Sequence, residues 1–167
     1  MKKLISLVLV SSICSICFSQ DFSKWNDYKF SSPADYKDKE PQIKECAMYI
    51  LSTPYDKKDI NRLIASKFIL DWMGGTPDYV FSFGDGYKYI ANGKKELEIS
   101  ELYVSATVVY VLDNPANAKD NKAADKAAVL KVIDYVANEA NKLEPNKRLK
   151  KLIEAKKNNT LEQEMHF

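Results

Sequence analysis

Histidine and cysteine, which most catalytic and zinc sites use, are scarce in this sequence. Among 167 residues there are three cysteines and one histidine, His166, next to the C-terminus. A Ser-His-Asp or Cys-His arrangement would have to use His166 as its base, and a chain end holds a base poorly within hydrogen-bonding distance of a nucleophile. A zinc site with the usual nitrogen and sulfur ligands is equally unexpected. The sequence therefore predicts no catalytic residue, no metal and no cofactor.

Glycine is also rare, and the common phosphate-binding loops are missing. The five glycines form neither the G-x-G-x-x-G pattern nor the G-x-x-x-x-G-K-[ST] pattern, in which backbone amides cradle phosphates. The acids Asp78 and Asp85, near Gly84 and Gly86, do not follow the spacing of an EF-hand calcium loop. A solvated turn is the simpler interpretation of this stretch.

The sequence has a short apolar run at its N-terminus and no long apolar run elsewhere. Two lysines precede an apolar stretch over residues 4–10, and the small residues Cys17 and Ser19 precede a cleavage point before Gln20. This pattern is typical of a secretory signal peptide, here over residues 1–19. A membrane anchor is the alternative, but a span needs about 20 predominantly apolar residues. We expect a periplasmic or secreted protein with no stable transmembrane anchor after cleavage.

The apparent excess of positive charge belongs to the signal peptide. The chain has 25 Lys and Arg against 23 Asp and Glu, and removal of Lys2 and Lys3 makes the two signs equal. A neutral mature chain gives no evidence for nucleic-acid binding. Cleavage also leaves Cys46 as the one cysteine, so no intramolecular disulfide is predicted. Cys46 falls on an apolar stripe, where we expect a buried and inert thiol.

Apolar residues recur at helical spacing along most of the mature chain. The spacing predicts five helices, over residues 41–51, 56–73, 94–112, 117–138 and 145–157. Their short connections favour antiparallel neighbours within one bundle. An extended polar and aromatic lead over residues 20–40 precedes this helical domain of residues 41–158, and a frayed tail is expected over residues 159–167.

The second predicted helix ends at the glycine pair Gly74-Gly75. Asp56 is its expected N-cap, its wide apolar surface predicts a central position packed on several sides, and one glycine is expected to form a left-handed C-terminal cap. Aromatic residues then favour extended structure over residues 79–90, with a hairpin turn at residues 84–86; a short helix starting at Thr76 is the alternative. The predicted fold class is mainly α, a single-domain bundle of about five helices with a short aromatic extended segment or hairpin between the second and third helices.

Two stretches of the chain resemble a known group of proteins. Residues 52–81 hold an S-T-P motif followed by W-M-x-G-T-P-D-Y-x-F, and residues 148–157 form a basic helix, R-L-K-K-L-I-E-A-K-K. These features resemble an uncharacterised family of small exported proteins of Bacteroidetes-type bacteria, over residues 40–161. The resemblance implies an export signal and a mainly helical fold, and it supplies no catalytic residue.

The lack of catalytic equipment favours a non-enzymatic binding or interaction module, whose partner would be a protein or a cell-envelope component. Tyr and Trp are enriched in binding hot spots. The candidate binding surface is Trp72, Thr76, Pro77, Asp78, Tyr79 and Phe81. Two alternatives stay open.

The first alternative is a carboxylate-based hydrolase, which needs a concave pocket with two acids within about 10 Å of each other. Its candidate acids are Asp71, Asp78, Asp85, Glu98 and Glu101. The second alternative is a periplasmic chaperone-like helper, which needs an apolar groove that the helix of residues 56–73 would line.

Overall fold

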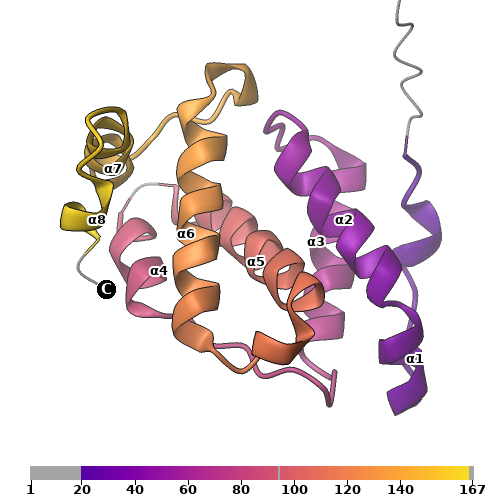
Figure 1. Ribbon diagram of the computed structural model, residues 1–167. Coiled ribbons are helices and arrows are strands. Elements are labelled where there is room, and N and C mark those ends of the chain that lie inside the picture. The colour runs from indigo at the N-terminus through magenta and orange to yellow at the C-terminus, as the bar shows by residue number, and fades with distance from the viewer. Residues whose placement is uncertain (1–19, 94, 166–167) are drawn as a thin grey trace, which may run out of the picture.

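The computed structural model describes residues 20–93 and 95–165, and it is mainly helical, with no β-strand in these residues. Its five long helices are α2 (Glu40–Ser52), α3 (Ile60–Met73), α5 (Glu96–Asp113), α6 (Asn121–Ala137) and α7 (Lys147–Lys157). They match the five predicted helices in order and position, so the predicted mainly α bundle is confirmed (Figure 1). The predicted signal peptide lies outside the described residues.

Short helices precede, connect and follow the long ones. They are η1 (Ser23–Trp25), α1 (Pro33–Asp38), α4 (Asp85–Ile90), η2 (Pro115–Asn117), η3 (Glu139–Asn141) and α8 (Leu161–Glu164). Within the described residues, no helix combines the length and the apolar character that crossing a bilayer requires.

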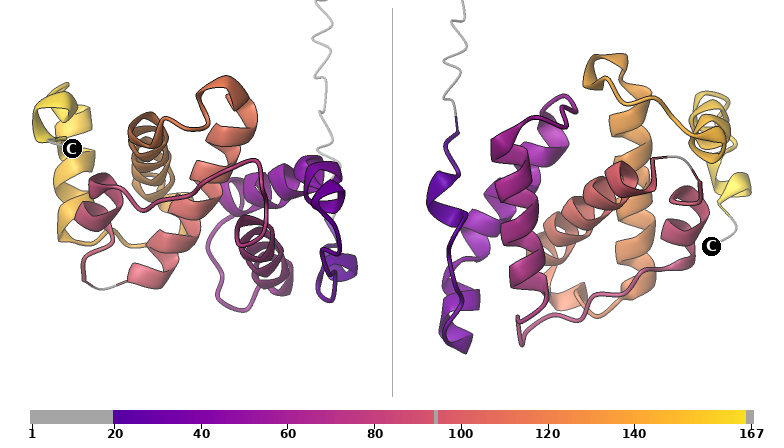
Figure 2. Two further views of the ribbon diagram at one scale, coloured as in Figure 1. Left: turned by 90° about the horizontal axis from the view of Figure 1, so that it is seen from below. Right: turned by 180° about the vertical axis from the view of Figure 1, so that it is seen from behind.

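Helix α5 is the central element of the bundle. Nine of its 18 residues are buried, because α2 packs against one of its sides and α6 against another (Figures 1 and 2). A helix that is apolar around so much of its circumference needs neighbours on several sides. Helix α3 packs on α2 at the other edge, and α4 and α7 pack on α6.

The N-terminal lead is more ordered than the sequence predicts. Phe22 is buried and meets Tyr49 edge to face, and Trp25 and Phe30 stack on the ring of Phe68. Ser32 then starts α1 through a capping box, in which the Asp35 carboxylate accepts a hydrogen bond from the Ser32 backbone N–H. The prediction of an extended lead is therefore wrong over α1, and the aromatic rings attach the lead to α3.

The cap predictions for α3 are wrong at both ends. Asp59, not Asp56, is the N-cap, because its carboxylate accepts a hydrogen bond from the Arg62 backbone N–H at 3.1 Å. At the other end Gly74 has φ −72°, an ordinary right-handed value. Gly75 is required for a different reason: a Cβ there would lie 2.0 Å from the Tyr36 hydroxyl. The glycine makes room for the close approach of a side chain.

The predicted strand after the glycine turn is also wrong, because Asp85–Ile90 forms helix α4. The cause is a residue distant in sequence. The Asp125 carboxylate, on α6, accepts hydrogen bonds from the backbone N–H groups of Gly86 at 2.8 Å and Tyr87 at 3.1 Å. These are amides that a helix start leaves without an intrahelical partner. Residues 79–83 are neither helix nor strand, so the predicted hairpin does not form.

The C-terminal tail is packed rather than frayed over its described part. Helix α8 is held by ion pairs from Lys126 to Glu162 at 2.8 Å and from Lys151 to Glu164 at 2.5 Å. Met165 is buried against the core. The expectation of a frayed tail is therefore wrong for residues 161–165, and His166 lies outside the described residues.

Candidate functional site

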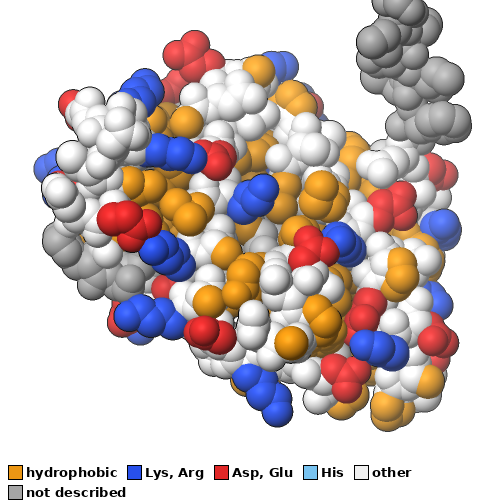
Figure 3. All heavy atoms as spheres, viewed as in Figure 1, with side chains coloured by type: hydrophobic (Ala, Val, Ile, Leu, Met, Phe, Trp, Pro, Cys, Tyr) orange, Lys and Arg blue, Asp and Glu red, His pale blue; other side chains and the backbone are white. Residues whose placement is uncertain are grey.

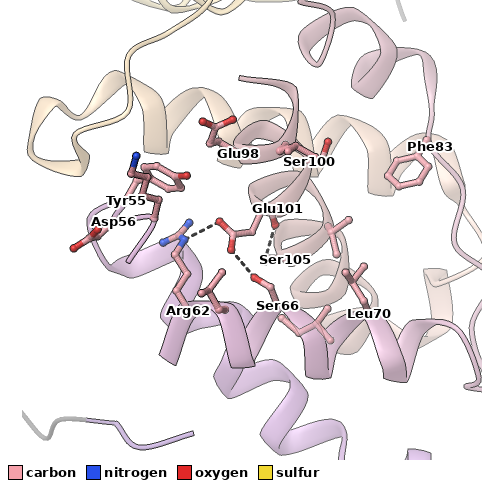
Figure 4. A pocket seen from close by; sticks show the side chains of 15 residues that line it. Tyr55, Asp56, Arg62, Ser66, Leu70, Phe83, Glu98, Ser100, Glu101 and Ser105 are labelled. Carbon is pink, nitrogen blue, oxygen red and sulfur yellow. Dashed lines mark hydrogen bonds and ion pairs between the residues drawn. The ribbon is translucent and has the colours of Figure 1, made fainter. Parts of the chain in front are cut away.

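Helices α3 and α5 enclose an apolar groove on the described surface. Both pack closely on α2 but make few contacts with each other, so a pocket of about 380 Å³ remains between them (Figure 4). The loop before α3 closes one end and Phe83 the other. Its lining is Tyr55, Asp56, Lys57, Arg62, Leu63, Ser66, Ile69, Leu70, Phe83, Leu97, Glu98, Ser100, Glu101, Val104 and Ser105.

Large apolar side chains that water reaches line most of this groove. Leu63 and Leu70 on α3 are 54% and 56% exposed, Phe83 is 53% exposed and Leu97 on α5 is 84% exposed. The prediction that α3 is packed on several sides is therefore wrong on this side of the helix. Single exposed apolar residues are ordinary, but a contiguous patch around a cavity marks an interaction or ligand site.

The floor of the groove carries a buried ion pair. Arg62 Nε donates to Glu101 Oε2 at 2.7 Å, and Arg62 Nη1 donates to the Ile50 backbone oxygen at 3.1 Å. Arg62 is only 2% exposed. The Ser66 hydroxyl donates to the other oxygen of Glu101. Burial of a charge is costly unless it is paired and hydrogen-bonded, and these contacts meet that requirement at two of the three guanidinium nitrogens.

The Arg62 guanidinium is also enclosed by aromatic rings. It lies 5.3 Å from the ring centroid of Tyr55 and 5.9 Å from that of Tyr135. Burial raises the pKa of Tyr135, and the positive guanidinium opposes that rise. The third nitrogen, Nη2, is inaccessible to water and meets no acceptor in hydrogen-bonding geometry among the described residues. The guanidinium thus belongs to the protein interior and not to the open groove.

Polar side chains gather at the end of the groove that holds this ion pair. The Tyr55 ring, Glu98 and Glu101 face the same end of the groove (Figure 4). Burial raises the pKa of the Tyr55 hydroxyl, and the carboxylates of Glu98 and Glu101 raise it further. Among residues 20–93 and 95–165, neither the Tyr55 hydroxyl nor the Glu98 carboxylate has a hydrogen-bond partner. The groove therefore has one polar end and an apolar remainder.

Two of the five acids expected of a hydrolase, Glu98 and Glu101, share this groove, whereas Asp71 pairs with Lys67 and Asp85 with Lys88 at the surface. A general acid in glycoside hydrolysis is a carboxyl group kept protonated by an apolar setting. Glu101 instead accepts from a guanidinium and a hydroxyl. Both carboxylate oxygens are thus engaged in contacts that join α3 to α5, so the arrangement suits a structural role.

The six residues predicted as a binding surface lie apart from the groove. Trp72 and Tyr79 are buried, and their rings are in contact with each other and with Phe81. The Trp72 Nε1–H donates to the Tyr36 backbone oxygen at 3.0 Å. Thr76 is half-buried, while Pro77 and Asp78 are exposed. None of the six lines the groove, and the aromatic members cover one end of the core.

The groove residues were missed for an identifiable reason. Leu63 and Leu70 lie on a different face of α3 from its buried residues, such as Phe68 and Ile69. They therefore add nothing to the packing of α3 against the core. The sequence shows this wide apolar surface, which predicts that other elements pack on several sides of the helix. The periodicity of apolar residues shows that a helix has an apolar face, but it does not show whether another helix covers that face in the folded chain.

Neither a metal cluster in the described residues nor a charged patch on the face drawn in Figure 3 competes with the groove. No group of three His, Cys, Asp or Glu side chains in the described part of the chain is placed to hold a metal ion. Positive and negative side chains alternate over the face shown in Figure 3 rather than gathering into a patch of one sign.

Comparisons with known proteins leave the family open. No family model matches the chain, no curated protein matches it, and no solved structure matches it. The resemblance to exported Bacteroidetes-type proteins therefore stays a prediction, and any functional argument must start from the groove between α3 and α5.

Proposed function

We propose that this chain is a non-enzymatic binding module whose ligand site is the groove between α3 and α5. One observation carries the proposal: four large apolar side chains, Leu63, Leu70, Phe83 and Leu97, are each more than half exposed around one pocket of about 380 Å³. A pocket of this size lies within the range of small-molecule sites, which are mostly apolar with a few polar groups.

The exposed surface sets the scale of the expected affinity. Full burial of a Leu or Phe side chain contributes about 1.5–3 kcal/mol, and these four are already partly covered. A ligand that covers the rest gains roughly 4–6 kcal/mol before the costs of association. Because the costs of association offset much or all of this gain, the apolar part of the interaction alone predicts weak binding.

The proposed setting is outside the cytoplasm. The pattern of residues 1–19 supports export, and the neutral mature chain fits a ligand that is not a nucleic acid. The partner we propose is an apolar compound or component of the cell envelope. We propose that the ligand binds in the groove and not at the turn of residues 76–78.

Titration with octanol, a small apolar probe, tests the proposal. We expect saturable binding that weakens at least fivefold in Leu70→Ser, because this substitution removes apolar contact in the groove. The matched control is Met48→Ser on α2, since Met48 is 48% exposed but lies outside the groove. Equal effects of both substitutions, or no saturable binding at all, would contradict the proposal.

A chaperone-like helper is the second candidate, because that hypothesis requires an apolar groove along α3 and the groove is there. A holdase suppresses aggregation of an unfolding client protein at near-equal molar amounts, and Leu70→Ser would reduce this suppression. A module that binds small ligands leaves the aggregation of the client unchanged. Light scattering of a heat-aggregating client, with and without the protein, separates the two candidates.

A further inference from the structure

We propose that the ligand of the α3–α5 groove is a small cationic amphiphile, with an apolar body along Leu70 and Phe83 and an ammonium group at Glu98. The inference rests on the proposed function and adds to it the charge and position of the ligand's polar group. Its basis is the unequal availability of acids and bases within the groove.

Carboxylates are available at the polar end. The Glu98 side chain is only partly buried and has no hydrogen-bond or ion-pair partner among residues 20–93 and 95–165. Glu101, one helical turn further along α5, is partly exposed and accepts one hydrogen bond on each oxygen. Because a carboxylate oxygen has two lone pairs, Glu101 retains capacity for another donor. Residues three apart on a helix lie on the same face.

The arginine of the groove is not available to a ligand. Arg62 is committed to Glu101 and to the Ile50 oxygen. Its remaining nitrogen, Nη2, has almost no accessible surface, so an anion in the groove would not reach it without rearrangement of the floor. The other lining cation, Lys57, stands on the exposed loop beside Asp56, an acid of the same loop.

Tyr55 reports the sign of the potential in this corner. Two carboxylates, Glu98 and Glu101, raise the pKa of its hydroxyl more strongly than Arg62 lowers it. The negative groups therefore outweigh the guanidinium at the polar end. A positive group placed there would lie against an aromatic ring as well as carboxylates, and both attract cations.

The size of the groove favours a small molecule as the occupant. About 380 Å³ lies near the lower end of the range for ligand pockets. Leu63 and Leu70 on α3 are seven positions apart, which corresponds to about 10 Å along the helix axis. This length matches an alkyl chain of about eight carbons lying along the groove, so octyl compounds are suitable probes.

Three octyl compounds that differ in head group test the charge preference. At pH 7 octylammonium is positive, octanol is neutral and octanoate is negative. We expect octylammonium to bind about fivefold more tightly than octanol, as for a partly exposed ion pair, and octanoate to bind most weakly. Calorimetric titration at 20 mM salt, below the micelle concentration of each probe, measures the three dissociation constants.

Glu98→Gln identifies the group responsible. Because Glu98 is not buried, the fold should persist, and circular dichroism checks this. We expect the variant to lose most of the preference for octylammonium over octanol, measured as the ratio of the two dissociation constants. The matched control is Glu96→Gln, an exposed acid in the same helix that does not line the groove.

The outcomes separate the two proposals. Equal binding of the three compounds, or tightest binding of octanoate, overturns the inference while the groove stands as an apolar site. An equal loss of octylammonium affinity in Glu96→Gln and Glu98→Gln also overturns it. If none of the three compounds binds, the proposed function fails, and the inference fails with it.

Discussion

Arg62 and Glu101 join α3 to α5 across the floor of the groove, with Arg62 Nε 2.7 Å from Glu101 Oε2 and the arginine 2% exposed. The two helices make few other contacts. The pair therefore fixes the spacing of the two walls at one end. It also removes from the groove the one positive charge that lies deep within it.

Loss of one partner of this pair should destabilise the protein more than loss of both. Glu101→Leu leaves a guanidinium buried without its carboxylate, and we expect a loss of about 3 kcal/mol in the free energy of unfolding. In the double variant Arg62→Met/Glu101→Leu most of this loss should be recovered, because apolar residues of similar volume replace the pair. Urea denaturation of the wild type, both single variants and the double variant measures the cycle. Single-variant losses below about 1 kcal/mol, typical of surface pairs, would contradict a structural role.

Asp125 should be a second major source of stability. It is buried, and its carboxylate accepts from the Tyr103 hydroxyl at 2.6 Å and from two backbone amides of α4. Asp125→Ala leaves three buried donors without an acceptor, so we expect a loss of about 3 kcal/mol or more. Tyr103→Phe removes one of these hydrogen bonds and should cost about 1 kcal/mol.

Hydrogen exchange provides the local check on Asp125. If its carboxylate holds the start of α4, the amides of Gly86 and Tyr87 should lose protection in Asp125→Ala before α5 and α6 do. Unchanged protection of these two amides would show that α4 forms independently of Asp125.

The two adjacent glycines should respond differently to alanine. Gly75→Ala places a Cβ 2.0 Å from the Tyr36 hydroxyl, so Tyr36 must move and we expect a loss of about 1–3 kcal/mol. Gly74→Ala meets only ordinary contacts at a right-handed φ of −72° and should be neutral or stabilising by up to about 1 kcal/mol. Thermal unfolding of both variants makes the comparison. A larger loss in Gly74→Ala would instead support the left-handed cap that the sequence predicts.

Cys46 should make stability fall at alkaline pH. Burial raises the pKa of its thiol to about 12, whereas a cysteine in an unfolded chain has a pKa of about 8.5. Between these values the unfolded chain loses a proton that the folded chain retains, so the free energy of unfolding falls as pH rises; below about pH 8.5 the thiol has no effect. Urea denaturation at pH 7, 8.5 and 10 should show a smaller decline in Cys46→Ala than in the wild type.

Thiol labelling gives an independent check. Native Cys46 should react with a disulfide reagent at pH 8 far more slowly than the denatured chain does, because it is buried and protonated. Equal labelling rates in the two states would contradict the burial of the thiol.

The long helices could be predicted from the local spacing of apolar residues, whereas their caps and the segments that connect them could not. Apolar spacing placed α2 within one residue of its observed bounds, because that helix buries one clear stripe. Helix α4 was predicted as a strand, since its tyrosines favour extended structure while its cap, Asp125, comes from α6. Gly75 depends on Tyr36, about 40 residues earlier. Such tertiary contacts leave no periodic signal in the sequence.

The candidate site could be predicted only in part from the sequence, for the same reason. Glu98 and Glu101 are among the five candidate acids that the sequence offers, and an apolar groove along the helix of residues 56–73 is one of the predicted alternatives. Arg62, Tyr55 and Phe83 could not be joined to them, because they come from three other segments that meet only in the folded chain. The sequence instead predicts a binding surface at the aromatic turn, where the rings of Trp72 and Tyr79 are buried.

The most direct test is methyl chemical-shift mapping during titration with octanol, because it reports where binding occurs as well as whether it occurs. We predict saturable shifts for Leu63, Leu70, Leu97 and Val104, which line the groove, and none for Met48 or Val80, which are exposed elsewhere. Shifts that do not saturate, or that are as large at Met48 and Val80 as in the groove, would contradict a ligand site between α3 and α5.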